Sequence, residues 1–120
     1  MAQGFLAGLN DAQRRAVDHH VGPLLVVAGA GSGKTRVLIH RIAWVCEVDG
    51  HSPYGVLAVT FTNKAAAEMR SRVEALLGIS ATAMWVGTFH AVGARILRRH
   101  ADRLGWDRTF SIFDAAQSLR

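Results

Sequence analysis

The chain has 120 residues, of which half are apolar and 19% are charged, so a disordered polypeptide is excluded and one globular domain can form. Its net charge of +5 favours a polyanionic partner such as nucleic acid, a nucleotide or an anionic membrane surface. The single cysteine, Cys46, excludes an internal disulfide framework. The sequence has no signal peptide, and no apolar run approaches the ~20 residues that span a bilayer, so we expect a cytoplasmic protein without membrane contact.

The first predicted elements are a short helix and an apolar strand. Asn10 with Gln13 three positions later is the pattern of a capping box, which predicts a helix over 11–20. Residues 24–28 form a continuous apolar run bounded by turn residues, which is typical of a strand buried on both faces of a parallel sheet. Cys46 falls in the next predicted helix, where we interpret it as a small buried hydrophobe.

The order of strand and helix then repeats along the chain. The predicted strands cover 24–28, 56–61 and 84–86. The predicted helices cover 11–20, 34–48, 63–77 and 88–104, with another beginning at Asp114. This alternation predicts parallel βαβ units and an α/β fold. Because three parallel strands leave edges and faces uncovered, we expect residues 1–120 to be one truncated domain, incomplete at its C-terminus.

A glycine-rich turn between the first strand and the second helix carries the strongest chemical signal. It comprises Ala28, Gly29, Ala30, Gly31, Ser32, Gly33, Lys34 and Thr35. Alternating glycines let backbone N–H groups turn towards phosphates, and the following helix N-terminus adds partial positive charge. Lys34 would then reach the β- and γ-phosphates of ATP, and the Thr35 hydroxyl would ligate Mg²⁺. Ala28 stands where the general pattern has its first glycine, but the Gly-Lys-Thr end is intact.

Four segments, in this order, resemble motifs of superfamily 1 DNA helicases of the UvrD/Rep/PcrA group. Residues 9–17 resemble the Q motif, 28–35 resemble motif I, 57–69 resemble motif Ia, and 87–90 resemble the next DNA-contacting motif. The set covers nearly the whole chain, and its order and spacing make it more specific than any one motif. The resemblance implies a P-loop NTPase with a RecA-like parallel sheet and flanking helices.

On the nucleotide side, the resemblance implies roles for two further residues. Gln13 would read the adenine edge, because its amide both donates and accepts hydrogen bonds; helix capping is its alternative or additional role. Arg36 would contact the nucleotide, with a solvated helix arginine as the alternative. Lys34 and Thr35 would be the catalytic residues of this loop.

On the DNA side, the resemblance implies that Phe61, at the C-terminal end of its strand, stacks on a base of single-stranded DNA. The alternative is that Phe61 is a residue of the hydrophobic core. The residues that would contact the DNA backbone are Thr60, Thr62, Asn63, Lys64, Thr88 and His90. A structural hydrogen bond is the alternative for His90. Three arginines recur at helical spacing, namely Arg95, Arg99 and Arg103. They form either a row of contacts to DNA phosphates or a solvated helix face.

The function implied is that of an ATP-dependent DNA helicase, whose parent protein couples ATP hydrolysis to 3′→5′ translocation on single-stranded DNA and to unwinding at duplex junctions. Hydrolysis also needs an acid that holds Mg²⁺, a base and an arginine, for which the family uses later motifs and a second RecA-like domain. Three acids, Glu47, Glu68 and Glu74, lie on predicted helices rather than at a strand end. We therefore expect the isolated chain to bind ATP weakly without hydrolysing it.

Three other functions are kept as alternatives. A helicase–nuclease shares these N-terminal motifs and differs downstream. A small-molecule kinase would share only the phosphate loop. A non-catalytic nucleotide- or nucleic-acid-binding remnant would keep the fold without the motor activity. The pathway, whether DNA repair, replication restart or plasmid copying, and the oligomeric state are left open by the sequence.

Overall fold

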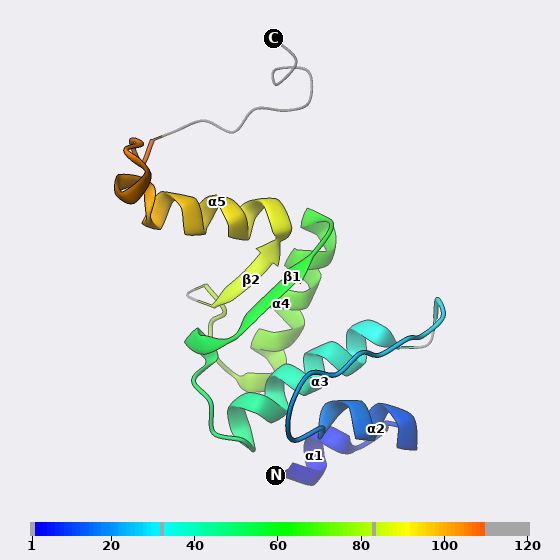
Figure 1. Ribbon diagram of the computed structural model, residues 1–120. Helices are drawn as coiled ribbons and strands as arrows, with labels where there is room; N and C mark the ends of the chain where they lie inside the picture. The colour runs from blue at the N-terminus through cyan, green and yellow to red at the C-terminus, as the bar shows by residue number, and fades with distance from the viewer. Residues whose placement is uncertain (1, 32, 83, 110–120) are drawn as a thin grey trace.

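A computed structural model describes residues 2–31, 33–82 and 84–109 of the chain. Its helices are α1 (Ala2–Leu6), α2 (Asp11–Val17), α3 (Lys34–Glu47), α4 (Asn63–Leu77) and α5 (Phe89–Arg99), with short 3₁₀ helices η1 (Pro53–Gly55) and η2 (Ala101–Leu104). Its strands are β1 (Leu57–Thr60) and β2 (Trp85–Thr88). Figure 1 shows the three N-terminal helices gathered at one end, the two strands in the middle and α5 beyond the strand tips.

The two strands form a parallel pair that is connected through α4. Leu57 is opposite Trp85, and the register runs on to Thr60 opposite Thr88. Because the strands are parallel, their C-terminal ends meet at one edge, where α4 and α5 both begin. This arrangement, visible in Figure 1, confirms a mixed α/β architecture and places the residues that follow both strands next to each other.

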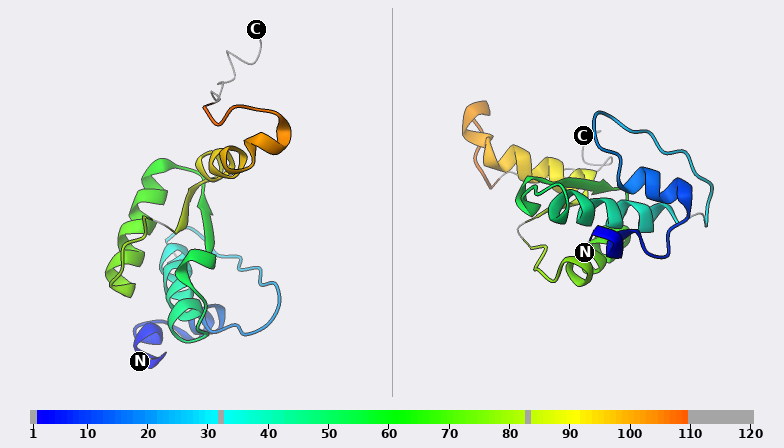
Figure 2. Two further views of the ribbon diagram at one scale, coloured as in Figure 1. Left: turned by 90° about the vertical axis from the view of Figure 1, so that its left-hand side faces the viewer. Right: turned by 90° about the horizontal axis from the view of Figure 1, so that it is seen from below.

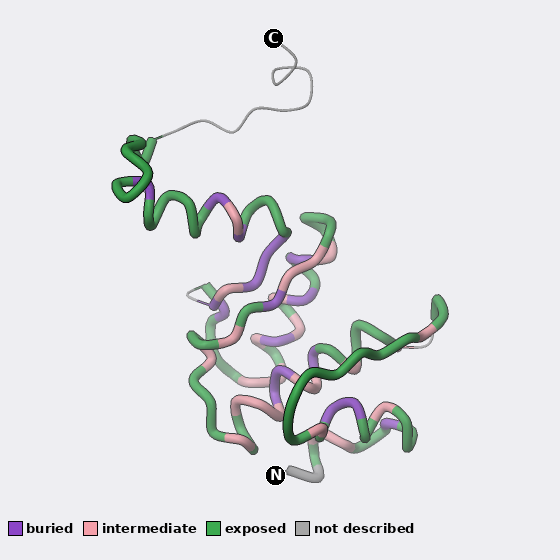
Figure 3. Tube along the Cα trace, in the orientation of Figure 1, coloured by how far each residue is buried: buried purple, intermediate pink, exposed green. Residues whose placement is uncertain are grey.

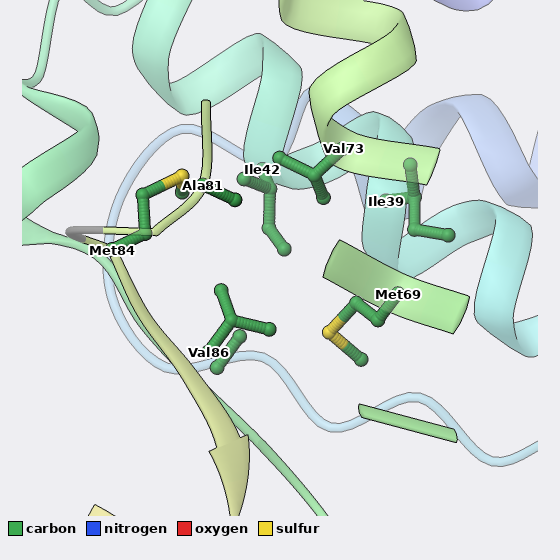
Figure 4. Packing of buried hydrophobic residues seen from close by; sticks show 8 residues of the cluster. Ile39, Ile42, Met69, Val73, Ala81, Met84 and Val86 are labelled. Atoms are coloured by element: carbon green, nitrogen blue, oxygen red, sulfur yellow. The ribbon is translucent and has the colours of Figure 1, made fainter. Parts of the chain in front are cut away.

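The main core lies where α3, α4 and the two strands meet. Its buried side chains are Ile39, Ile42, Ala58, Met69, Val73, Ala81, Met84 and Val86. Figure 4 draws these side chains and labels all but Ala58; Ile39 and Ile42 of α3 point into the space that they share with Met69 and Val73 of α4 and with Val86 of β2. The phosphate-loop helix is thus packed, through its apolar face, onto the helix that follows β1.

Several predicted boundaries are confirmed. Helix α4 spans the predicted residues: the Thr62 hydroxyl accepts a hydrogen bond from the Ala65 N–H at its start, and Gly78 ends it in the left-handed region at φ +68°. The capping box at Asn10 is also present, although α2 ends earlier than predicted, at Val17. The helix predicted from Asp114 lies outside the described residues.

Two helical predictions need correction. The helix expected over 88–104 ends at Arg99, and a 3₁₀ turn follows over Ala101–Leu104, because His100 leaves the helical region at φ −118°. Helix α1, Ala2–Leu6, was not predicted at all. It has neither an acidic residue in its first turn nor a basic one in its last turn, so the sequence carries no terminal signal for it.

The strand predicted over 24–28 is a third correction. This segment is extended but pairs with neither β1 nor β2, and Leu25 and Val27 are 86% and 87% exposed. Figure 3 shows it exposed along almost its entire length. An apolar run indicates that a strand is to be buried by other elements, but it does not identify the strand or helix that buries it. In the described part of the chain β1 and β2 pair with each other, so the parallel sheet has two strands where three were predicted.

Candidate nucleotide and nucleic-acid sites

Helix α2 carries the first predicted nucleotide-binding residue in a fixed position. The Asn10 side chain accepts a hydrogen bond from the Gln13 N–H at 2.9 Å, and the Gln13 Oε1 accepts one from the Asn10 N–H at 2.9 Å. Two N–H groups that a helix N-terminus leaves without partners are satisfied in this way. The capping role of Gln13 is confirmed, and it holds the amide of Gln13 across the start of the helix.

The phosphate loop ends at Gly33, which caps α3 in the left-handed region at φ +83°. Gly31 also has a positive φ, +76°, so both positions need glycine for backbone reasons. The N-cap residue Gly33 has no side chain with which to cap the first turn of α3, which begins with the exposed Lys34 and Thr35. The N–H groups of that turn are therefore suited to an anion. Ser32 lies outside the described residues.

Gln13 meets the phosphate loop in space. The Nε2 atom of Gln13 lies 2.9 Å from the position that a β-carbon on Gly33 would occupy. Beside this contact is a hollow of about 190 Å³ whose lining includes Gln13, Ala28 and Lys34. The fold therefore brings the predicted base-reading amide and the phosphate-binding lysine to one place.

Arg36 is turned towards a different neighbour. Its Nη2 atom is 2.7 Å from where a β-carbon on Gly8 would lie, and Gly8 has φ +75°. The guanidinium thus packs over the turn between α1 and α2. Arg36 is exposed, and its predicted nucleotide contact stays a prediction.

At the other end of the molecule, both strands finish in threonine-capped helices. Thr62 caps α4, and the Thr88 hydroxyl accepts a hydrogen bond from the Ala91 N–H at 3.1 Å at the start of α5. Thr60 donates through its hydroxyl to the Thr62 carbonyl at 3.2 Å. Thr88 is 7% exposed, so its hydroxyl is engaged inside the protein. Two positive helix ends consequently point from the same edge of the sheet.

Phe61 lies between these helix ends and is 89% exposed. This exposure rules out the alternative of a core phenylalanine. The ring centroid of Phe61 is 5.1 Å from that of Phe89, with the two planes tilted by 40°. Such a pair has the separation of a favourable aromatic contact, so Phe89 supports one side of the Phe61 ring.

Phe89 was missed by the sequence reasoning, although it is 53% exposed beside Phe61. Its spacing of three residues from Val92 and seven from Ile96 is that of an apolar helix face, which reads as core. The available signal was its place inside the motif over 87–90, which follows the predicted strand over 84–86.

Four of the seven predicted DNA-contacting residues line one hollow. It has a volume of about 270 Å³ and is lined by Phe61, Asn63, Thr88, His90 and Ala91. Asn63, His90 and the neighbouring Lys64 are exposed. An aromatic ring, polar side chains, a lysine and two helix N-termini make a surface suited to stacked bases and phosphates.

The predicted arginine track is partly anchored. The Arg95 guanidinium lies 3.9 Å from the centre of the Trp85 ring, and that of Arg99 lies 5.9 Å away. Arg95 also donates to the Met84 carbonyl at 3.2 Å. Arg103 falls in η2, beyond the end of α5, so the three arginines do not continue along one helix. The cation–π contacts keep Arg95 and Arg99 on the Trp85 side of α5.

The acidic residues of α4 have structural partners. Glu68 is 3.9 Å from Arg72, and the Glu74 carboxylate accepts a hydrogen bond from the Ala81 N–H at 2.9 Å. Within residues 2–31, 33–82 and 84–109, no three His, Cys, Asp or Glu side chains gather as a metal site would require. No helix in this same part of the chain is long and apolar enough to cross a membrane.

Comparison with known proteins gives a consistent result. Residues 9–120 match the model of the UvrD/REP helicase N-terminal domain. The chain is 55% identical over 115 residues to ATP-dependent DNA helicase PcrA of Bacillus subtilis, and 56% identical over 116 residues to DNA helicase II of Escherichia coli. These alignments cover 96% and 97% of this chain but 16% of each relative. With the Gln13–phosphate-loop contact and the Phe61 surface, this match shows that the chain belongs to the UvrD/REP helicase family, in its N-terminal domain.

Proposed function

We propose that this chain is the nucleotide-binding and first DNA-binding part of an ATP-driven DNA helicase. The observation that carries the proposal is the contact of Gln13 with Gly33 beside Lys34, which joins a base-reading amide to a phosphate-binding turn. The names of the matched relatives, ATP-dependent DNA helicase and DNA helicase II, support the same activity for the longer protein.

The phosphate loop fits the triphosphate of ATP. Gly31 and Gly33 carry no side chain that would block the approach of phosphate oxygens, and Gly33, as the N-cap of α3, offers no side-chain cap that would compete with them. Lys34 would bind the β- and γ-phosphates, and the Thr35 hydroxyl would be the ligand that this chain offers to Mg²⁺. When bound, Mg²⁺ neutralises charge that develops on the phosphate oxygens.

The second surface takes single-stranded DNA. A base stacks on the face of Phe61 that Phe89 leaves open, and Asn63, Lys64 and His90 contact the sugar–phosphate backbone. Stacking and phosphate contacts read no base edges, so binding is independent of sequence. Thr60, Thr62 and Thr88 shape this surface, because their hydroxyls make the hydrogen bonds that begin the helices and the intervening turn.

The two surfaces are joined through packed elements. Helix α3 starts at the phosphate loop and packs on α4, and α4 starts at Asn63 on the DNA side. A shift of α3 on nucleotide binding is therefore transmitted to the Phe61 edge of the sheet through the shared core. In the longer protein, a second RecA-like domain supplies the remaining groups for hydrolysis, and 3′→5′ translocation and unwinding at junctions follow from the coupled cycle. This chain alone binds ATP weakly and does not turn it over.

A crossed pair of variants tests the proposal. Lys34→Ala should remove binding of a fluorescent ATP analogue and leave binding of an oligo-dT strand unchanged, whereas Phe61→Ala should have the opposite effect. Tight, salt-sensitive oligo-dT binding that ignores ATP and is unaffected by Lys34→Ala, in a chain with no nucleotide binding for that substitution to remove, would instead identify a non-catalytic nucleic-acid-binding module. Robust ATP hydrolysis by this chain alone, abolished in Lys34→Ala, would overturn the assignment of the missing catalytic groups to another domain.

A further inference from the structure

Arg41 connects the phosphate-loop helix to the helix that carries Gln13. One atom of its guanidinium, Nη1, lies 2.9 Å from the Val17 carbonyl oxygen, 2.8 Å from that of His19 and 3.4 Å from that of Ala16. All three carbonyls are at or just beyond the end of α2, while Arg41 is in the middle of α3. Figure 2 shows α2 and α3 side by side, as these hydrogen bonds require.

Two of these carbonyls, those of Ala16 and Val17, are groups that α2 cannot satisfy by itself, and that of His19 follows just beyond its end. The last four C=O groups of any α-helix have no partner within the helix, and a cation at that end also interacts favourably with the helix dipole. Helix α2 has only seven residues, a length at which an isolated helix is not stable. Arg41 therefore helps α2 to form and fixes its C-terminal end against α3.

The segment that joins α2 to α3 does not fix the position of one helix relative to the other. The segment over 24–28 is extended, pairs with no strand of the described sheet and is largely exposed. Burial of Ala16 and Val17 holds α2 on the protein, but apolar contacts have little directional preference. The hydrogen bonds of Arg41 are directional, so they set where along α3 the short helix sits.

Gln13 depends on that position. Its Nε2 atom reaches Gly33 from the first turn of α2, and the carbonyls held by Arg41 follow in the last turn and just beyond it. Arg41 and Lys34 also line one hollow of about 340 Å³ between the two helices and the extended segment. A displacement of α2 would move the amide of Gln13 away from the loop while leaving Lys34 and the glycines, which belong to α3 and its own turn, in place.

We propose that Arg41 is a positioning residue for recognition of the adenine base: through the three carbonyls at and just beyond the end of α2 it holds Gln13 beside the phosphate loop. This inference rests on the proposed function, in which Gln13 reads adenine and Lys34 binds the triphosphate. Nucleotide affinity then has two separate contributions, recognition of the base through Gln13 and binding of the phosphates through Lys34. Loss of Arg41 weakens the preference for adenine over other bases and spares the binding of phosphate.

The test compares three probes on the full chain: N-methylanthraniloyl-ATP, the corresponding GTP derivative, and unlabelled tripolyphosphate as a competitor. Arg41→Ala should lower the ATP-to-GTP affinity ratio about tenfold, the equivalent of one lost hydrogen-bonding interaction. Tripolyphosphate should compete as well as it does against the original chain. Arg41→Lys should restore part of the ratio, because an ammonium reaches some of the carbonyls. Arg15→Ala, which removes an exposed arginine of α2, is the matched control and should leave the ratio unchanged.

The outcomes separate the inference from the proposed function. If the original chain binds both nucleotides equally, adenine recognition by Gln13 fails, and the inference fails with it. If the original chain prefers ATP and Arg41→Ala, folded by circular dichroism, keeps the full preference, the proposed function stands and the inference is overturned. Should Arg41→Ala unfold, Arg41→Lys decides: a reduced ratio in a folded protein supports the positioning role, and an unchanged ratio overturns it.

Discussion

The side-chain amide nitrogen of Gln13 lies 2.9 Å from the place that a β-carbon on Gly33 would take, so a methyl group there would push against the Gln13 amide. Gly33 also has φ +83°, where an L side chain is strained by about 1–3 kcal/mol. We therefore expect Gly33→Ala to lower both the free energy of unfolding and ATP affinity, measured by urea denaturation and by titration with a fluorescent ATP analogue.

Gly93 offers a matched control for this substitution. It lies inside α5, has no atom within 4 Å of its added β-carbon and has no positive φ. Gly93→Ala should raise the free energy of unfolding by about 0.5–1 kcal/mol and leave ATP affinity unchanged. Equal effects of the two substitutions would contradict a specific role for the Gly33–Gln13 contact.

Removal of the capping residue of α2 should affect both stability and nucleotide binding. Asn10→Ala deletes the acceptor for the Gln13 N–H, and we expect a loss of about 1 kcal/mol in the free energy of unfolding. ATP affinity should fall as well, because the first turn of α2, which carries Gln13, loses its side-chain cap, although the backbone N–H of residue 10 can still donate to the Gln13 Oε1. Asn10→Ser, which keeps an oxygen acceptor, should recover most of both quantities. A stability loss without any change in ATP affinity would mean that capping is the whole function of Gln13.

The exposed aromatic pair leads to a prediction about DNA. Phe61→Ala should weaken oligo-dT binding about five- to hundredfold, the loss of one base–aromatic stack, with little effect on stability because the ring is 89% exposed. Phe89→Ala should weaken binding less, since Phe89 supports Phe61 from one side. Fluorescence anisotropy measures the affinities. Tyr54→Ala, at a side chain that is 62% exposed in η1, is the control for loss of an exposed aromatic ring. A Tyr54→Ala effect as large as that of Phe61→Ala would show non-specific binding.

The partly buried thiol of Cys46 gives a pH-dependent prediction. Desolvation by burial, and secondarily the charge of Glu47, raise the pKa of Cys46 because both disfavour the thiolate. The pKa of Cys46 is higher in the folded chain than in the unfolded chain, so protonation of the thiol contributes to the free energy of unfolding. This contribution is fully present below the unfolded pKa and is lost as pH rises through the folded pKa. We expect 5,5′-dithiobis(2-nitrobenzoate) to react more slowly with the folded than with the urea-unfolded chain, with the rate rising at higher pH in the folded chain. Identical pH profiles for the two states would show that the thiol is not perturbed.

The features that the sequence predicted correctly depend on interactions between residues close together in the chain. The capping box of Asn10 and Gln13 and the limits of α4, from the Thr62 cap to Gly78, are decided within one or two helical turns. The sequence predicted Phe61 as the last residue of a strand, and the structure has it directly after Thr60, where β1 ends; its exposure agrees with the surface role inferred from motif resemblance. The positive φ values at Gly31 and Gly33 suit the loop that the glycine pattern indicated.

Only the tertiary structure decided which distant segments meet. The apolar run over 24–28 was expected to be a buried strand of the sheet, but β1 pairs with β2 and not with this segment. Strand pairing depends on partners that are far away in the sequence. The contact between Phe61 and Phe89 and the hydrogen bonds from Arg41 to the end of α2 have the same origin. By itself, the sequence determined the local elements and the chemistry that each carries; the packing of α3 and α4 on the parallel strands decided their juxtaposition, since burial of apolar surface joins residues without regard to their separation along the chain.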